Sequence, residues 1–213
     1  MSVYEYRTLR IERASWPRLT ADVFGATAAA TREAGGGIFL LCAGVIGFAA
    51  DEGVLIRAWP DADTMAARAA AMLAADAIVC SSMQAVTPTV RPKSADAPVQ
   101  DGVYAHRWFW VHEPDVPEFI RLSEDGVWPY FEAVGCRIVG LWRAPAKPRD
   151  LVPVLLITRY DSVSHWERTR LQSPEPPPGV DAALYRSAQA AVRRRAALTR
   201  RSIVRLTRPV FAM

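Results

Sequence analysis

The seven residues from His106 to His112, HRWFWVH, place two imidazoles, one guanidinium and two indoles within one short stretch. A histidine with an unperturbed pKa of about 6.5 can donate or accept a proton at neutral pH. An arginine can stabilise the anionic or enolate end of a ligand. The sequence therefore predicts His106 and Arg107 as catalytic residues, with Arg159 as a second candidate for stabilising an anion.

Aromatic side chains surround these candidates and predict the walls of a pocket. Ligand pockets are mostly apolar, with a few convergent polar groups. The predicted substrate-binding residues are Tyr104, Trp108, Trp110, Trp142, Tyr160, His165 and Trp166. Core packing would explain the same tryptophans, and a hydrogen-bonded core histidine would explain His106, so both interpretations stay open at this point.

A metal site is not predicted. His106 and His112 would lie on the same side of one strand, but roughly 20 Å apart at the rise of a strand, so they cannot share an ion. The cysteines are far apart in the sequence and predict neither a disulfide nor a zinc site: Cys42, Cys80 and Cys136. Haem needs only one axial histidine and stays an alternative, while the predicted cofactor is none.

Composition places the chain among globular proteins. Its 213 residues are 51% hydrophobic, enough for one large or two small domains. The longest apolar run, residues 37–50, is broken by small residues and is too short to cross a bilayer, so no membrane span is expected. The first 13 residues lack the pattern of a secretion signal, so we expect a cytoplasmic protein. Arginine far outnumbers lysine, which favours a bacterial source.

Positive charge is concentrated at the C-terminal end. The net charge is +4, and residues 180–213 contain eight arginines against one acid, Asp181. Residues 183–202 have the apolar spacing of a helix, with the arginines mostly off the apolar side, which favours a solvated face. An anionic ligand or a nucleic acid is the alternative partner. Because no stacking aromatics alternate with these arginines, nucleic acid is not the predicted partner.

An internal repeat organises the chain. A shift of about one hundred residues aligns Tyr4 with Tyr104 and Arg7 with Arg107, among other pairs. We predict a first unit at residues 1–92, a linker at 93–101 and a second unit at 102–213. The second unit carries a proline-rich insertion at 173–179, which would form a stiff rim or lid.

Both halves have the same predicted order of strand, helix, strand, strand, helix, strand. Residues 4–12 and 102–112 have strand composition, and helices follow at 15–36 and 115–135. Ser15 and Asp115 are the predicted N-caps of these helices, and each helix ends at its C-terminus in glycine. This order predicts an α+β protein of two tandem ferredoxin-like units, each an antiparallel sheet with helices on one face. The uncovered faces of the two sheets would shield each other.

Two segments of the second half resemble the NIPSNAP family: WPYFEAVGCRIVGLW at 128–142 and VLLITRYDS at 154–162. This family belongs to the dimeric α/β-barrel superfamily, with antibiotic-biosynthesis monooxygenases, muconolactone isomerases and haem-degrading enzymes. The resemblance implies an intrachain barrel in which the two units act as two subunits. It also weighs against haem, because the haem-degrading relatives carry their ligand well along a helix where this chain has only His165, in the first turn.

Together these features predict a small-molecule enzyme of bacterial secondary metabolism that needs no cofactor. It would act on a hydrophobic aromatic or polyketide-like substrate as a monooxygenase, isomerase or cyclase. A non-catalytic ligand-binding or scaffold protein is the alternative, and a haem-binding protein is a further one. Pairing of two chains as a homodimer stays open.

Overall fold

The computed structural model describes residues 2–69, 78–98, 101–146 and 150–211. Its contacts divide the chain into two compact units. Unit 1 comprises Met1–Pro88, Pro92–Asp101 and Arg205–Met213, and unit 2 comprises Thr89–Arg91 and Gly102–Val204. The segment predicted as a linker, 93–101, thus contacts unit 1, and so does the C-terminal end of the chain, which the prediction assigned to the second unit.

Unit 1 is an antiparallel sheet with the strand order β4-β1-β3-β2. Its elements are β1 (Val3–Ile11), η1 (Arg13–Ser15), α1 (Trp16–Asp22), the π-helical segment η2 (Val23–Thr27), α2 (Ala28–Glu33), β2 (Gly37–Ile46), β3 (Glu52–Trp59), α3 (Ala62–Arg68) and β4 (Ile78–Pro88). This order of elements and strands is the ferredoxin-like arrangement.

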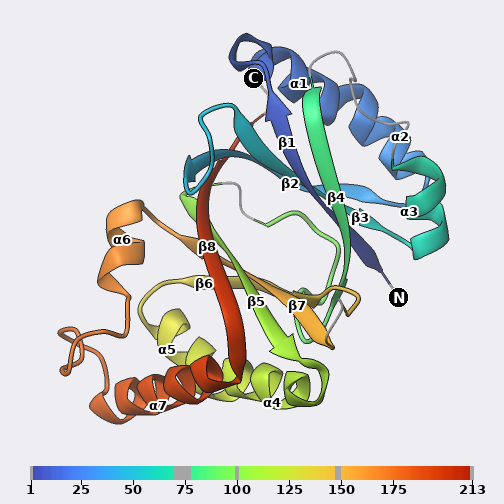
Figure 1. Cartoon of the computed structure of the whole chain (residues 1–213). Helices are drawn as coiled ribbons and strands as arrows, with labels where there is room; N and C mark the ends of the chain where they lie inside the picture. The colour runs from blue at the N-terminus through green and yellow to red at the C-terminus, as the bar shows by residue number, and fades with distance from the viewer. Residues whose placement is uncertain (1, 70–77, 99–100, 147–149, 212–213) are drawn as a thin grey trace. The chain divides into compact units, whose positions relative to one another are not determined.

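Unit 2 repeats the arrangement with the strand order β8-β5-β7-β6. Its elements are β5 (Val103–His112), η4 (Glu113–Asp115), α4 (Val116–Arg121), the π-helical segment η5 (Leu122–Val127), α5 (Trp128–Ala133), β6 (Arg137–Arg143), β7 (Leu151–Tyr160), α6 (Val163–Arg168), α7 (Ala182–Leu198) and β8 (Thr199–Pro209) (Figure 1). The first half of β8 belongs to unit 2 and the second half to unit 1. The predicted fold class, α+β with two ferredoxin-like units, is confirmed.

The long helix after the first strand of each unit differs from its prediction in detail. Both are interrupted by a π-helical turn, and in unit 2 this turn precedes α5, whose second residue is Pro129. Ser15 and Asp115 occupy the predicted N-cap positions of α1 and α4, but neither side chain makes a cap hydrogen bond. The glycine ends are confirmed: Gly35 and Gly135 have φ of +76° and +83°, a backbone region that favours glycine.

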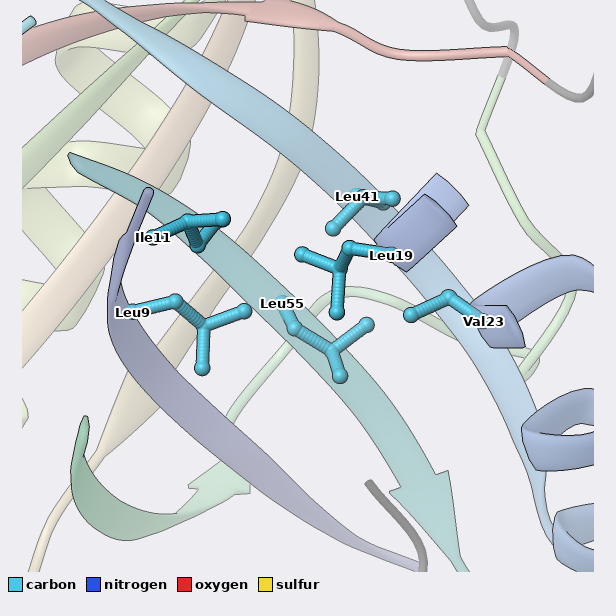
Figure 2. Close-up of a cluster of buried hydrophobic side chains, with 6 residues drawn as sticks. All are labelled: Leu9, Ile11, Leu19, Val23, Leu41 and Leu55. Atoms are coloured by element: carbon cyan, nitrogen blue, oxygen red, sulfur yellow. The ribbon is translucent and has the colours of Figure 1, made fainter. Parts of the chain in front are cut away.

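Alternate residues of the first strand in each unit point toward the helices. In unit 1 the helix side carries a fully buried cluster of Leu9, Ile11, Leu19, Val23, Leu41 and Leu55, contributed by β1, β2, β3 and the first helix (Figure 2). In unit 2 the Phe109 ring of β5 lies 5.1 Å from the Phe119 ring of α4. Since side chains alternate along a strand, Ala105, Arg107, Phe109 and Val111 share the helix side.

Unit 1 also buries charge on this helix side. The Glu5 carboxylate, 0% exposed, accepts hydrogen bonds from Arg7 Nε at 2.6 Å, from Arg57 Nε at 2.9 Å and from Trp59 Nε1 at 3.0 Å. Arg57 is also 0% exposed and donates to the Ala69 carbonyl oxygen at 2.7 Å. One carboxylate is therefore the shared counter-charge of two buried guanidinium groups.

The substitution Glu5→Gln tests this cluster. It removes the negative charge but keeps the size of the side chain, so two buried guanidinium groups lose their counter-charge. We expect the free energy of unfolding to fall by about 3 to 5 kcal/mol, measured by urea denaturation. Asp51→Asn is the control: it removes an exposed ion pair with Arg10 and should cost less than about 1 kcal/mol. Equal effects of the two changes would contradict the prediction.

Candidate functional site

The two faces of β5 separate the predicted catalytic residues. His106 pairs with Ile157 of β7 and Arg107 with Leu156, and successive residues of a strand point to opposite sides of the sheet. Arg107 lies on the helix side, whereas His106, 1% exposed, lies on the opposite side. The structure thus does not bring His106 and Arg107 into one cavity.

The other predicted residues divide in the same way. Pairing across β5, β7 and β6 puts four of them on the side of His106: Tyr104, Trp108, Trp142 and Arg159. Trp110 also follows this parity, and its ring lies 4.9 Å from the Arg201 guanidinium. Tyr160 pairs with Val103 and lies on the helix side with Arg107. Trp166 and His165 do not lie on a strand but on helix α6, which follows β7.

A cavity of about 400 Å³ lies on the helix side of unit 2. It is lined by Arg107, Phe109, Val127, Phe131, Arg170, Leu171, Gln172, Val192, Arg195, Ser202, Ile203 and Val204. The volume is within the usual range for sites of small organic molecules. Three guanidinium groups among mostly apolar and aromatic side chains make this cavity suited to a ligand with an apolar body and negative charge.

Arg195 is the most deeply buried charge of the cavity. It is 7% exposed and donates from Nη1 to Ser123 Oγ at 3.0 Å. Its guanidinium lies 4.9 Å from the centre of the Phe109 ring and 5.0 Å from that of Phe119. Burial, and to a smaller extent the nearby positive charge of Arg107, lower the pKa of Arg195 to about 9.

Helix α7 holds Arg195 in this position. The Asp181 side chain caps the helix by accepting from the Leu184 N–H at 2.7 Å. A Cβ added to Gly126 of η5 would lie 2.4 Å from Ala191 Cβ, so glycine permits the close approach of the two helices. Ser123 donates to the Phe119 carbonyl oxygen at 2.7 Å, which leaves its oxygen to accept from Arg195.

Arg107 is half-buried beside two aromatic side chains. Its guanidinium lies 5.9 Å from the centre of the Phe131 ring. Burial raises the pKa of the Tyr160 hydroxyl, and the nearby Arg107 charge opposes this rise. The hydroxyl is buried but has no partner with hydrogen-bond geometry among the described residues. The Arg107 charge and the Tyr160 hydroxyl thus lie close together on the helix side.

Within the described part of the chain, no carboxylate forms an ion pair with Arg107, Arg170 or Arg195. Other arginines of unit 2 do have such partners: Arg194 donates to both carboxylate oxygens of Glu118, at 2.7 and 2.9 Å, and Arg159 pairs with Asp161. Arg170 instead lies 5.5 Å from the Trp166 ring. The cavity is therefore a local concentration of positive charge to which none of the described carboxylates contributes a counter-charge.

His165 lines a second pocket, of about 510 Å³. The proline-rich insertion contributes Pro177, Pro178 and Gly179 to the lining of this pocket. The His165 Nδ1 accepts from the Asp161 N–H at 3.2 Å, and its Nε2 lies 2.8 Å from the Val134 carbonyl oxygen. Both ring nitrogens are engaged, so His165 does not fit the role of a haem ligand. Among the described residues, no group of three or more histidine, cysteine, aspartate or glutamate side chains could hold a metal ion.

Sequence reasoning missed Arg195, Phe109 and Phe131. The arginine-rich helix was interpreted as a solvated face, but its buried residues are Tyr185, Ala188, Ala191, Arg195 and Leu198, at intervals of three or four. Arg195 therefore lies within the apolar stripe, and this position is a signal available in the sequence.

Within the described residues, no helix is both long and apolar enough to cross a membrane.

No protein-family model matched the chain, and neither did any curated protein. Three solved structures similar in fold are an anthrone oxidase-like protein (TM-score 0.60, 13% identity, 98% of this chain and 91% of that one), an uncharacterized ferredoxin-fold protein from Listeria monocytogenes related to antibiotic biosynthesis monooxygenases (0.51, 9%, 99% and 96%), and a heme-binding protein from Thermus thermophilus (0.52, 11%, 99% and 91%). At these identities the likeness shows the fold alone.

These likenesses agree with the predicted ferredoxin-like fold, whereas the NIPSNAP family stays a prediction. A NIPSNAP domain protein from Burkholderia xenovorans covers 51% of this chain with a TM-score of 0.39 and 18% identity. A similarity at this level carries no argument about function.

The duplicated positions Arg7 and Arg107 offer a matched pair of substitutions. Arg7→Met removes a hydrogen bond to the buried Glu5 carboxylate, and we expect it to lower the free energy of unfolding by about 1.5 to 3 kcal/mol. Arg107→Met removes a charge that repels Arg195, so we expect no loss or a gain of up to about 1 kcal/mol. Urea denaturation without ligand measures both. A loss in Arg107→Met as large as that in Arg7→Met would show that Arg107 has a structural role.

Proposed function

We propose that this protein is a small-molecule enzyme that binds a hydrophobic aromatic or polyketide-like substrate in the helix-side cavity of unit 2 and oxygenates it without a cofactor. The observation that supports this proposal is the cavity of about 400 Å³, lined by Phe109 and Phe131, with a guanidinium, Arg107, that has no carboxylate partner among the described residues. The rings would contact the body of the substrate, and Arg107 would stabilise its negative charge.

The reaction class follows from what this cavity can do. A positive charge in a site of low dielectric constant lowers the pKa of an acidic C–H or O–H group of a bound molecule. A ring-stabilised carbanion or enolate can then transfer an electron to O2, so neither a metal nor a flavin is required. For anthrone the balance is one molecule of anthrone and one of O2 giving one of anthraquinone and one of water. The fold likeness to an anthrone oxidase-like protein makes anthrone a suitable first probe.

The geometry gives the sequence-predicted residues different parts in this proposal. Arg107 and Tyr160 share the cavity side of the sheet, whereas His106 and Arg159 lie on the other side. Proton transfer by His106 would therefore belong to a different site, and the proton released in the cavity would pass to water. The predicted cytoplasmic location and the pairing of two chains stay predictions.

A non-catalytic ligand-binding protein is the second candidate, and one observation favours it. None of the residues that line the cavity is a histidine, aspartate, glutamate or cysteine, so the cavity contains no ordinary general base. In that case the same molecules would bind but would not be turned over.

Oxygen consumption with anthrone separates the two candidates. We expect the protein to accelerate uptake of O2 and formation of anthraquinone over the uncatalysed rate. Arg107→Met should reduce kcat/KM on the order of 100-fold, as expected for loss of a group that stabilises an anion. His106→Gln and Arg159→Met, on the opposite side of the sheet, serve as controls and should retain most activity.

The outcomes distinguish the sites. Loss of activity in His106→Gln with full activity in Arg107→Met would move the chemistry to the other side of the sheet. Saturable binding of anthrone without oxygen uptake would favour the ligand-binding protein.

A further inference from the structure

The two units differ in the side chains that surround the equivalent arginines Arg7 and Arg107. Arg7 of β1 and Arg107 of β5 are equivalent in the repeat, and each points toward the helices of its own unit. Two residues earlier, unit 1 has Glu5, whereas unit 2 has Ala105, which is 0% exposed. The carboxylate that pairs with Arg7 and Arg57 in unit 1 therefore has no counterpart at the equivalent position of unit 2.

Unit 2 nevertheless brings a second guanidinium to this place. Arg195 comes from α7, and the position equivalent to Val23 of the unit 1 core is Ser123, whose hydroxyl oxygen accepts from Arg195 at 3.0 Å. The Arg195 guanidinium also makes cation-π contacts with the rings of Phe109 and Phe119. Serine and aromatic rings fix the orientation of a guanidinium but supply no negative charge.

Burial of an arginine without an anion is unfavourable. Arg195 is only 7% exposed, and its electrostatic neighbours include Arg107, a like charge. The burial and this like charge both lower the pKa of Arg195. Among the described residues, the cavity therefore contains no carboxylate to balance Arg195, and a bound anion could supply this charge.

We propose that the cavity binds an aromatic carboxylate, whose carboxylate group lies between Arg107 and Arg195 and takes the part that Glu5 has in unit 1. This inference rests on the proposed function and names the class of its substrate. A carboxylate suits the site because it can accept hydrogen bonds from two guanidinium groups at once, as Glu5 does. The apolar lining, which includes Val127, Phe131 and Val192, suits an aromatic body.

A matched pair of ligands tests the charge directly. Anthracene-2-carboxylate and anthracene-2-carboxamide have nearly the same shape, and only the first is an anion at neutral pH. Fluorescence titration should show that the wild-type protein binds the acid at least about 30-fold more tightly than the amide. Arg195→Met should remove this preference and leave the affinity for the amide within a few-fold of the wild type.

Two further variants control the experiment. Arg194→Met changes the adjacent residue of α7, which is exposed and paired with Glu118, and it should leave the preference intact. Ala105→Glu places a carboxylate where unit 1 has one, and it should block binding of the acid. Because Arg195 is buried, the fold of each variant is checked by circular dichroism, and Arg107→Met, at a half-buried position, gives a second measurement of the preference.

The outcomes separate this inference from the proposed function. Equal binding of acid and amide, with no effect of Arg195→Met or Arg107→Met, would overturn the carboxylate and leave an aromatic-binding cavity. If neither compound binds to the wild type, both proposals fail. Loss of the preference in Arg194→Met as well would show that it arises from the net charge of α7, and the specific site would be rejected.

Discussion

A guanidinium buried on the helix side of a sheet needs a counter-charge, and this constraint explains how the two units differ. Unit 1 meets it internally, because the Glu5 carboxylate accepts hydrogen bonds from both Arg7 and Arg57. Unit 2 has Ala105 at the equivalent place and adds Arg195 from α7, without a carboxylate within the described residues. The same fold thus contains one closed ion cluster and one open cavity with positive charge.

The architecture explains why the open cavity can exist. In unit 2 the long α7 lies against the π-helical segment η5, where Gly126 permits close contact with Ala191 (Figure 1). This packing brings the buried stripe of α7 over the first strand, so that Arg195 contacts Phe109 from above the sheet. The unit 1 counterpart of this region is filled by leucine, isoleucine and valine side chains (Figure 2). A cavity therefore forms where aliphatic packing is replaced by arginine and aromatic rings.

The sequence predicts the duplicated ferredoxin-like fold well, because strand composition, helix spacing and the repeat all point to one arrangement. It predicts Arg107, and the alternation of a strand already places His106 on the opposite side of the sheet. No pattern in the strand tells which of these two sides the helices cover, because both sides are apolar. Arg195 was missed for a different reason. Eight arginines in residues 180–213 favour a solvated surface, and only the spacing of Arg195 within the buried stripe of α7 distinguishes it from the others.

The missing counter-charge also links stability to ligand preference. Positive charges held near each other in a poorly solvated cavity destabilise the unliganded protein, since each guanidinium has lost water without gaining an anion. An anionic ligand removes this unfavourable interaction when it binds, whereas a neutral molecule of the same shape leaves it in place. Part of the selectivity for an anion therefore arises from relief of repulsion between Arg107 and Arg195, in addition to the new hydrogen bonds. In unit 1 the Glu5 carboxylate already pairs with the buried arginines, which stabilises the protein. The same arrangement leaves no reason for this place to prefer an anionic ligand.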